Sequence, residues 1–205
     1  MSHPRPVVAV LHGLVAGAIG TAAMDLVLYS RFRRGGGESG FADWELSRGL
    51  TGWDEAPAPA QVGRRLVEGV FGREVPGERA ALTNDLMHWA YGTSWGAAYG
   101  IVAGSFARPP TLRSGLAFGS VVWAGDYVIL PLAGLYEPIW KYDARTLADD
   151  LSAHLVFGVV TATTFRLLRA VSAPPRARGC RRQAAGASAT AASGVATRKL
   201  KDSTR

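Results

Sequence analysis

The residues of this 205-residue chain that could carry chemistry are aspartates and histidines set inside otherwise apolar stretches. Asp85 and His88 stand three residues apart, and Asp150 and His154 stand four apart. Both spacings place the acid and the imidazole on one face of a helix. A charged group inside a bilayer costs at least about 2.5 kcal/mol on insertion scales, so we expect these residues to have a role.

Two further aspartates, Asp25 and Asp126, lie late in apolar stretches of their own. If successive helices alternate in direction across a membrane, late residues of the first and third helices share a side with early residues of the second and fourth. His12 alone then falls toward the other half of the bilayer. The sequence therefore predicts one intramembrane Asp/His cluster, made of His88, His154, Asp85, Asp150, Asp25 and Asp126.

Three kinds of role fit this Asp/His cluster. Imidazole and carboxylate ligands suit a divalent metal such as Zn, Mn or Fe, with His88 and His154 as nitrogen ligands and the aspartates as oxygen ligands or as partners of the imidazoles. The same groups could relay protons, because imidazole titrates near neutral pH and buried acids shift toward it. The third role is structural, and in it the histidines only bridge helices.

In the structural interpretation the acids cap helix starts, where side-chain oxygens and the helix dipole favour them. Residues 83–85 would cap the second helix, and Thr146 with Asp149 would form a capping-box-like start to the fourth. Asp126 fits this interpretation least well, because it lies about ten residues before the expected end of its helix.

Four apolar stretches are long enough to hold the cluster inside a membrane, since a span takes roughly 20 residues. We interpret the first as a retained helix, not a cleaved signal peptide, because its apolar run resumes after Asp25. The fold class is therefore all-α, an integral membrane bundle of about four transmembrane helices. The predicted spans are residues 7–29, 82–106, 112–136 and 147–168, with the transmembrane domain covering 1–170.

The glycines predict how these helices meet. Residues 92, 96, 100 and 104 are glycines at strict four-residue spacing, as in a glycine zipper, and Gly13 with Gly17 and Gly115 with Gly119 repeat the spacing. Small residues let helix backbones approach closely in lipid, so a tight bundle or a homo-oligomer face is expected. Each half of the chain also shows a late Asp, a loop, and an early Asp and His followed by Gly. This order suggests a duplicated helical hairpin with parallel repeats.

Two segments lie outside the predicted spans. The long loop 30–81 holds a short amphipathic helix over 61–71, with Val62, Leu66, Val67 and Val70 on one face, which either lies on the membrane surface or packs as a connecting helix. The tail 171–205 is poor in large apolar residues and is expected to be disordered.

Charge is concentrated in that tail, where from residue 173 onward eight Lys and Arg face one acid and account for the whole net charge of +7. This distribution argues against a nucleic-acid partner, which needs a basic face on a folded element. It favours contact with the lipid bilayer and its anionic headgroups. The tail arginines also favour an orientation with both termini in the cytoplasm.

The sequence carries no phosphate loop, dinucleotide fingerprint or nucleophile elbow, so enzymatic activity is not favoured. The leading hypothesis is a multi-pass protein that handles a metal ion or protons through the cluster. The alternative is a non-catalytic membrane scaffold or stress-related protein. A membrane enzyme with a metal-activated water is a weaker third hypothesis.

The stretch 150–157, Asp-Leu-Ser-Ala-His-Leu-Val-Phe, and the Leu-Pro-Leu at 130–132 resemble the YagU-like family of bacterial inner-membrane proteins. The layout of one helix, a long loop and three closely connected helices is also similar. The resemblance implies a location in the bacterial inner membrane with both termini inside. That family has no established biochemical activity, so the resemblance implies no catalytic residue.

Overall fold

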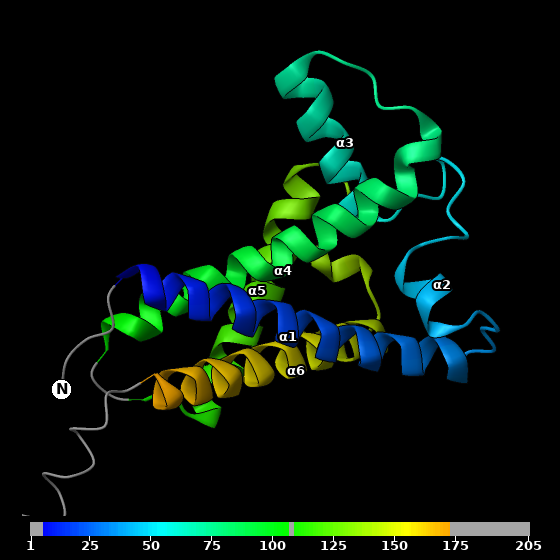
Figure 1. The fold of residues 1–205 in the computed structure, drawn as a ribbon. Helices are drawn as coiled ribbons and strands as arrows, with labels where there is room; N and C mark the ends of the chain where they lie inside the picture. The colour runs from blue at the N-terminus through cyan, green and yellow to red at the C-terminus, as the bar shows by residue number, and fades with distance from the viewer. Residues whose placement is uncertain (1–5, 107–108, 173–205) are drawn as a thin grey trace, which may run out of the picture. The chain divides into compact units, whose positions relative to one another are not determined.

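The computed structural model describes residues 6–106 and 109–172, and these residues form helices and connections with no β-strand among them (Figure 1). The chain divides into two units, residues 1–168 and 169–205. The description below concerns the first unit, and most of the predicted basic tail lies outside the described residues. The helices are α1 (Pro6–Arg34), α2 (Phe41–Glu45), α3 (Ala58–Phe71), α4 (Ala80–Ser105), α5 (Leu112–Leu132) and α6 (Ala144–Val171), with short 3-10 turns at Gly77–Arg79 and Ile139–Lys141.

Three of these helices, α1, α5 and α6, are long and apolar enough to cross a membrane. Three of the four predicted spans therefore have the length and composition that a membrane crossing needs. The remaining helix, α4, is 26 residues long and is not among the three. Asp85 is its only acidic residue, and its glycines, tryptophans and tyrosines lower its mean hydropathy without adding charge.

The third predicted span ends four residues too late. Helix α5 ends at Leu132, because Gly134 adopts a left-handed backbone with φ of 66°. The amide N–H of Leu135 donates to the carbonyl of Leu130 at 2.9 Å, and the amide of Gly134 donates to the carbonyl of Pro131 at 2.9 Å. This pair of hydrogen bonds is a Schellman motif, which ends a helix by satisfying its last carbonyls.

Helices α1 and α4 run antiparallel in backbone contact, as the glycine pattern predicts. A Cβ added to Gly17 would lie 2.8 Å from the Cα of Gly96, and one added to Gly13 would lie 3.0 Å from the Cα of Gly100. One turn further along, Gly92 faces the side chain of Thr21. Only glycine permits this approach, and the close contact gains dispersion energy along the whole interface.

Helices α5 and α6 meet in the same way. A Cβ added to Gly158 would lie 2.8 Å from the Cα of Gly119, and one added to Gly115 would lie 2.8 Å from the Cα of Val159. The contacts of Gly115 and Gly119 with Gly158 therefore repeat those of Gly13 and Gly17 with Gly96. Both helix pairs cross at glycines and place one residue of the second helix between two glycines of the first.

The two pairs join through larger side chains. Between α4 and α5, the rings of Tyr99 and Phe118 lie 4.7 Å apart. Between α1 and α6, Gly20 lies against Thr161 and Phe157. Each of the four helices thus contacts two antiparallel neighbours, and α1 lies beside both α4 and α6 in Figure 1. The core they share is small, and its members are Ala16, Tyr99, Ala162 and Phe165.

Helix α3 begins three residues before the predicted amphipathic helix and packs on α4 through small residues. Ala60 and Gly63 are buried, and Gly63 faces Thr83 and Met87 of α4. Leu66 and other apolar residues of the predicted face point outward instead, because the close approach at Gly63 turns them away from α4. Three of the four residues of the predicted face, Leu66, Val67 and Val70, are therefore exposed, and Val62 is partly buried.

The predicted helix caps are wrong in both cases. Helix α4 begins at Ala80, so residues 83–85 lie within it. At the start of α6, Asp143 caps the helix, because its carboxylate accepts from the amides of Arg145 and Thr146 at 2.9 and 3.0 Å. These bonds lower the pKa of Asp143, with those from the Thr146 amide and hydroxyl as the main causes. The pattern at Thr146 and Asp149 was read one turn too late.

Candidate functional site

The first predicted pair forms across the glycine contact of α1 and α4. The Nε2 atom of His88 lies 2.8 Å from Oδ1 of Asp25 in a hydrogen bond that joins the two helices. The antiparallel register that pairs Gly17 with Gly96 also brings these residues to one level. Asp25 is only 2% exposed, and His88 provides the hydrogen-bond partner of its Oδ1 atom.

The second pair joins α5 and α6, and it includes a tyrosine that the sequence argument missed. The Nε2 atom of His154 lies 3.2 Å from Oδ2 of Asp126, whose other oxygen accepts a short hydrogen bond from the hydroxyl of Tyr91. Tyr91 stands three residues after His88 and so lies on the same face of α4. That spacing was the available signal, but tyrosine was not counted among the ionisable residues.

The hydrogen bonds of His154 fix where its protons lie. Its Nδ1 atom is 2.9 Å from the carbonyl oxygen of Asp150, which can only accept, so Nδ1 carries a proton. A neutral imidazole with that proton has an accepting Nε2, and an ionised Asp126 can also only accept. The hydrogen bond between them therefore requires one more proton, on His154 or on Asp126. The His88–Asp25 pair has no such requirement.

His88 of the first pair and both residues of the second pair line a single cavity of about 310 Å³. Most of its wall is apolar, and the ionisable side chains gather on part of it. A mostly apolar cavity with a few converging polar groups is the usual form of a small-molecule site. The cavity is also bordered by α3 through Ala58, Pro59 and Val62, and its polar lining residues include His88, Tyr91, Asp126, Asp150 and His154.

Asp85 makes its hydrogen bond elsewhere. Its Oδ1 accepts from the hydroxyl of Ser47 at 2.7 Å, and the same hydroxyl accepts from the amide of Asn84 at 2.9 Å. Ser47 has a left-handed φ of 47°, a conformation that non-glycine residues seldom adopt. Asp85 thus holds the turn after α2 against α4, and it does not line the cavity.

Glu45 at the end of α2 is, after Tyr91, the other ionisable residue near the cluster that the sequence argument missed. It accepts a hydrogen bond from the indole of Trp89 at 3.0 Å. Burial raises the pKa of Glu45, and the nearby charge of Asp25 adds to the shift. No spacing rule connects a residue in the loop to one 44 positions later in a helix, so the sequence held no signal for this contact.

The six residues predicted as metal ligands do not converge on one point. Asp25 is paired with His88, and Asp126 with His154, whose two ring nitrogens face opposite directions toward different partners. Across the described ranges 6–106 and 109–172, no group of three or more His, Cys, Asp or Glu is arranged to hold a metal ion. Binding of Zn, Mn or Fe stays a prediction.

The described residues form an all-helical fold with three helices that could cross a membrane, and histidine–carboxylate pairs lie at a cavity between its helices. No family model matches the chain, and neither a curated protein nor a solved structure matches it. The similarity to the YagU-like family therefore stays a prediction.

Proposed function

We propose that the chain crosses the membrane four times. Helix α4 packs along α1 from the level of Gly13 and Gly100 to the level of Asp25 and His88. These twelve residues of α1 rise about 18 Å, more than half of a hydrocarbon core of about 30 Å. If α1 spans the bilayer, α4 occupies the same depth beside it. Among its polar side chains, His88 bonds Asp25 of α1 and Tyr99 bonds Ser114 of α5.

The four spans form two copies of one helical hairpin. The repeated glycine contacts support this proposal, and so does a shared sequence, Gly-Leu-Val-Ala-Gly at 13–17 and Gly-Leu-Ala-Phe-Gly at 115–119. Because both hairpins begin on the same side, the repeats are parallel and related by an axis along the membrane normal. The axis passes between α1, α4, α5 and α6.

The function that the cavity favours is proton handling. The observation that carries this proposal is the His154–Asp126 pair, whose hydrogen bonds require a shared proton beside a cavity that His88 also lines. The hydroxyl of Tyr91 on α4 donates to Asp126 and so offers a further route for that proton. Protons would enter the cavity, occupy the second pair and exchange with the first.

Reconstitution into liposomes tests this function. A pH-sensitive dye inside the vesicles reports proton flux under an imposed pH gradient, and His88→Ala with His154→Ala is compared with the unchanged chain. We expect the double variant to lose the flux. His12→Gln serves as the matched control, because His12 lies on α1 outside the cavity lining. Equal flux in the double variant and the unchanged chain would remove the proposal.

Absence of flux in the unchanged chain would favour the membrane scaffold instead. One observation supports that second candidate: each histidine bridges two helices through a hydrogen bond to an aspartate, which stabilises the bundle without any transfer. Metal content of the purified protein tests the metal hypothesis separately.

Location and orientation complete the proposal. The chain resides in a bacterial inner membrane with both termini in the cytoplasm, which places the cavity in the extracytoplasmic half. Labelling of single cysteines introduced in the loop 35–40 and at residue 109 from each side of the membrane tests the orientation.

A further inference from the structure

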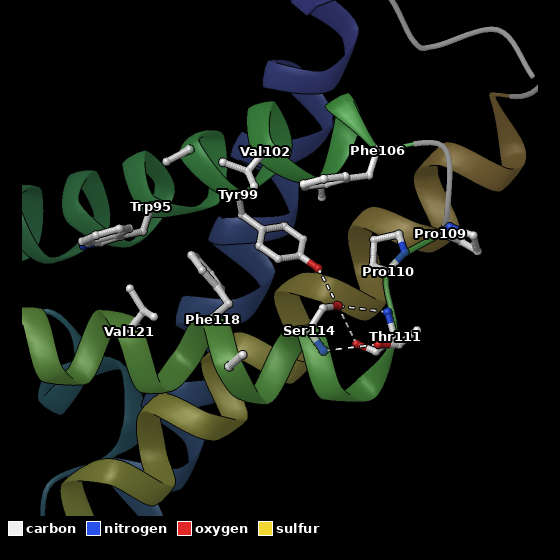
Figure 2. Close-up of a pocket in the computed structure, with 13 residues that line it drawn as sticks. Trp95, Tyr99, Val102, Phe106, Pro109, Pro110, Thr111, Ser114, Phe118 and Val121 are labelled. Atoms are coloured by element: carbon white, nitrogen blue, oxygen red, sulfur yellow. Dashed lines mark hydrogen bonds between the residues drawn. The ribbon is translucent and has the colours of Figure 1, made fainter.

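A second and larger hollow lies between α4 and α5 (Figure 2). Most of its lining residues lie further from the Asp/His pairs along these helices, toward the loop that joins α4 to α5. Its volume is about 860 Å³, within the roughly 300–1,000 Å³ range of small-molecule sites. None of its lining residues carries a charge. They run along α4 from Trp95 to Ala103 and along α5 from Ser114 to Val121, and Phe106 and residues 109–111 close the end.

The hollow exists because this interface holds large side chains where the equivalent interface holds small ones. Tyr99 follows Gly96 by three positions, as Thr161 follows Gly158, and Phe118 precedes Gly119 as Ala16 precedes Gly17. Thr161 and Ala16 are fully buried, and they let α6 close on α1. The rings of Tyr99 and Phe118 hold α4 and α5 apart.

From these contacts we infer that the groove between α4 and α5 binds one acyl chain of a membrane phospholipid. The inference rests on the proposed four-span topology. The groove follows α4 from Trp95 to its last residue, Ser105, about 15 Å by helical rise. That length is half of a hydrocarbon core of about 30 Å, which is the depth of one leaflet.

The rim of the groove is consistent with this occupant. Val102 and Val121 are each 60% exposed and would face the surrounding lipid. The hydroxyl groups of the lining lie toward the loop between the helices, where that of Tyr99 lies 3.2 Å from that of Ser114, and the indole of Trp95 lies at the other end (Figure 2). An acyl chain would therefore enter with its ester end near Thr111 and its methyl end near Trp95.

The test is photo-crosslinking in bilayers made of phosphatidylcholine with a diazirine at the middle of one acyl chain. We expect labelling of Tyr99, Val102 and Phe118 several-fold above that of Val15 and Ile19, which are exposed on α1 and meet only bulk lipid. Moving the diazirine toward the ester should shift the label toward Thr111. Equal labelling of the groove and the α1 face would overturn the inference.

A filled groove supplies the matched control. Ala98 and Ala117 line the groove and are exposed within it, so Ala98→Phe with Ala117→Phe should lower groove labelling to the level of the α1 face. Ala124→Phe places the same ring on α5 outside the groove and should leave the labelling unchanged. Thermal denaturation confirms that both variants fold. Groove labelling that persists in the filled variant, or a crosslink to a second copy of the chain, would contradict a bound acyl chain.

The outcomes separate this inference from the proposed function. If α4 does not span, its residues receive no label while α1 and α5 do, and the topology fails. If α4 is labelled evenly, the topology stands and only the acyl-chain site fails. Proton flux through the other cavity is expected to be the same in the filled variant and the unchanged chain.

Discussion

The pair α1/α4 and the pair α5/α6 share a backbone arrangement but differ in their ionisable side chains. In the repeated register, Gly158 takes the place of Gly96, so His154 corresponds to Gly92 and not to His88. The histidines are therefore one helical turn out of step between the pairs. The glycine contacts fix the positions of the helices, and the histidine can lie one helical turn earlier or later without disturbing those contacts.

This shift gives the two histidines different hydrogen bonds. His88 meets a deeply buried aspartate with one ring nitrogen, whereas both ring nitrogens of His154 are engaged. The hydrogen bond between His88 and Asp25 can form with a neutral imidazole, whereas that between His154 and Asp126 requires an additional proton. Substitutions at the glycines test the shared backbone, and substitutions at the histidines test the different chemistry.

The largest effect is expected at the glycine contacts. Gly96→Ala and Gly158→Ala each place a methyl group against the backbone of the opposing helix, which cannot move without separating the pair. Overpacking costs about 1–3 kcal/mol or more. Thermal denaturation in detergent should show a similar, large loss for both variants. Gly125→Ala is the control, because no atom lies within 4 Å of an added Cβ there. A loss at only one of the two contacts would break the equivalence of the pairs.

The second effect separates the two histidines. His88→Ala leaves the Asp25 carboxylate buried without its partner, and breaking a buried pair costs about 3–5 kcal/mol. His154→Ala leaves Asp126 with the hydrogen bond from Tyr91, so a smaller cost of about 1–3 kcal/mol is expected. Adding Asp25→Asn to His88→Ala should recover part of the lost stability, since it removes the unpaired charge. Equal losses for the two single variants would contradict the difference drawn between the pairs.

A smaller effect is expected where the two helix pairs, α1/α4 and α5/α6, join at the end of α1. The guanidinium of Arg31 donates to the carbonyl of Asp149 and to the hydroxyl of Ser152 of α6, both at 2.5 Å. Arg31→Met should cost about 1 kcal/mol, because these bonds are partly exposed to solvent. Arg33→Met is the matched control, since Arg33 donates only to carbonyls of its own loop. Equal melting temperatures for the two variants would show that the Arg31 contacts do not hold α1 to α6.

The smallest effect concerns pH and the start of α6. Because hydrogen bonds lower the pKa of Asp143 below its ordinary value near 3.8, the carboxylate stabilises the folded chain above that value. This contribution is lost as the pH falls through the lowered pKa. The stability difference between the unchanged chain and Asp143→Ala should therefore shrink on acidification from about pH 6 to about pH 3. Asp143→Asn keeps a capping side chain without a titrating group, and its difference from Asp143→Ala should stay constant with pH.

Sequence reasoning succeeded where a single periodic signal decides the structure. Apolar length predicted α1, α5 and α6, and the four-residue glycine spacing predicted backbone contact between helices. Both signals are local, and helix geometry converts them directly into position. Antiparallel register then brought Asp25 to His88 and Asp126 to His154.

The remaining features depend on contacts that no local pattern encodes. One cluster of six residues was expected, but Asp85 instead binds Ser47 in a turn 38 residues earlier. The apolar face of α3 was expected either to lie on the membrane surface or to pack as part of a connecting helix, and the small residues Ala60 and Gly63 decide which face meets α4. Helix α5 ends at Leu132, before the predicted end at residue 136, because Gly134 adopts a left-handed backbone. In each case a long-range contact or a single backbone angle outweighs side-chain polarity.

The central claim is that both pairs act on the same proton at one cavity. Proton flux in proteoliposomes containing the single variants His88→Ala and His154→Ala and the double variant tests it most directly. We predict that each single variant lowers the flux by roughly tenfold or more and that the double variant lowers it little further, because the two pairs lie on one path. Flux in the double variant equal to that of the unchanged chain would contradict the claim and leave the histidines with a structural role.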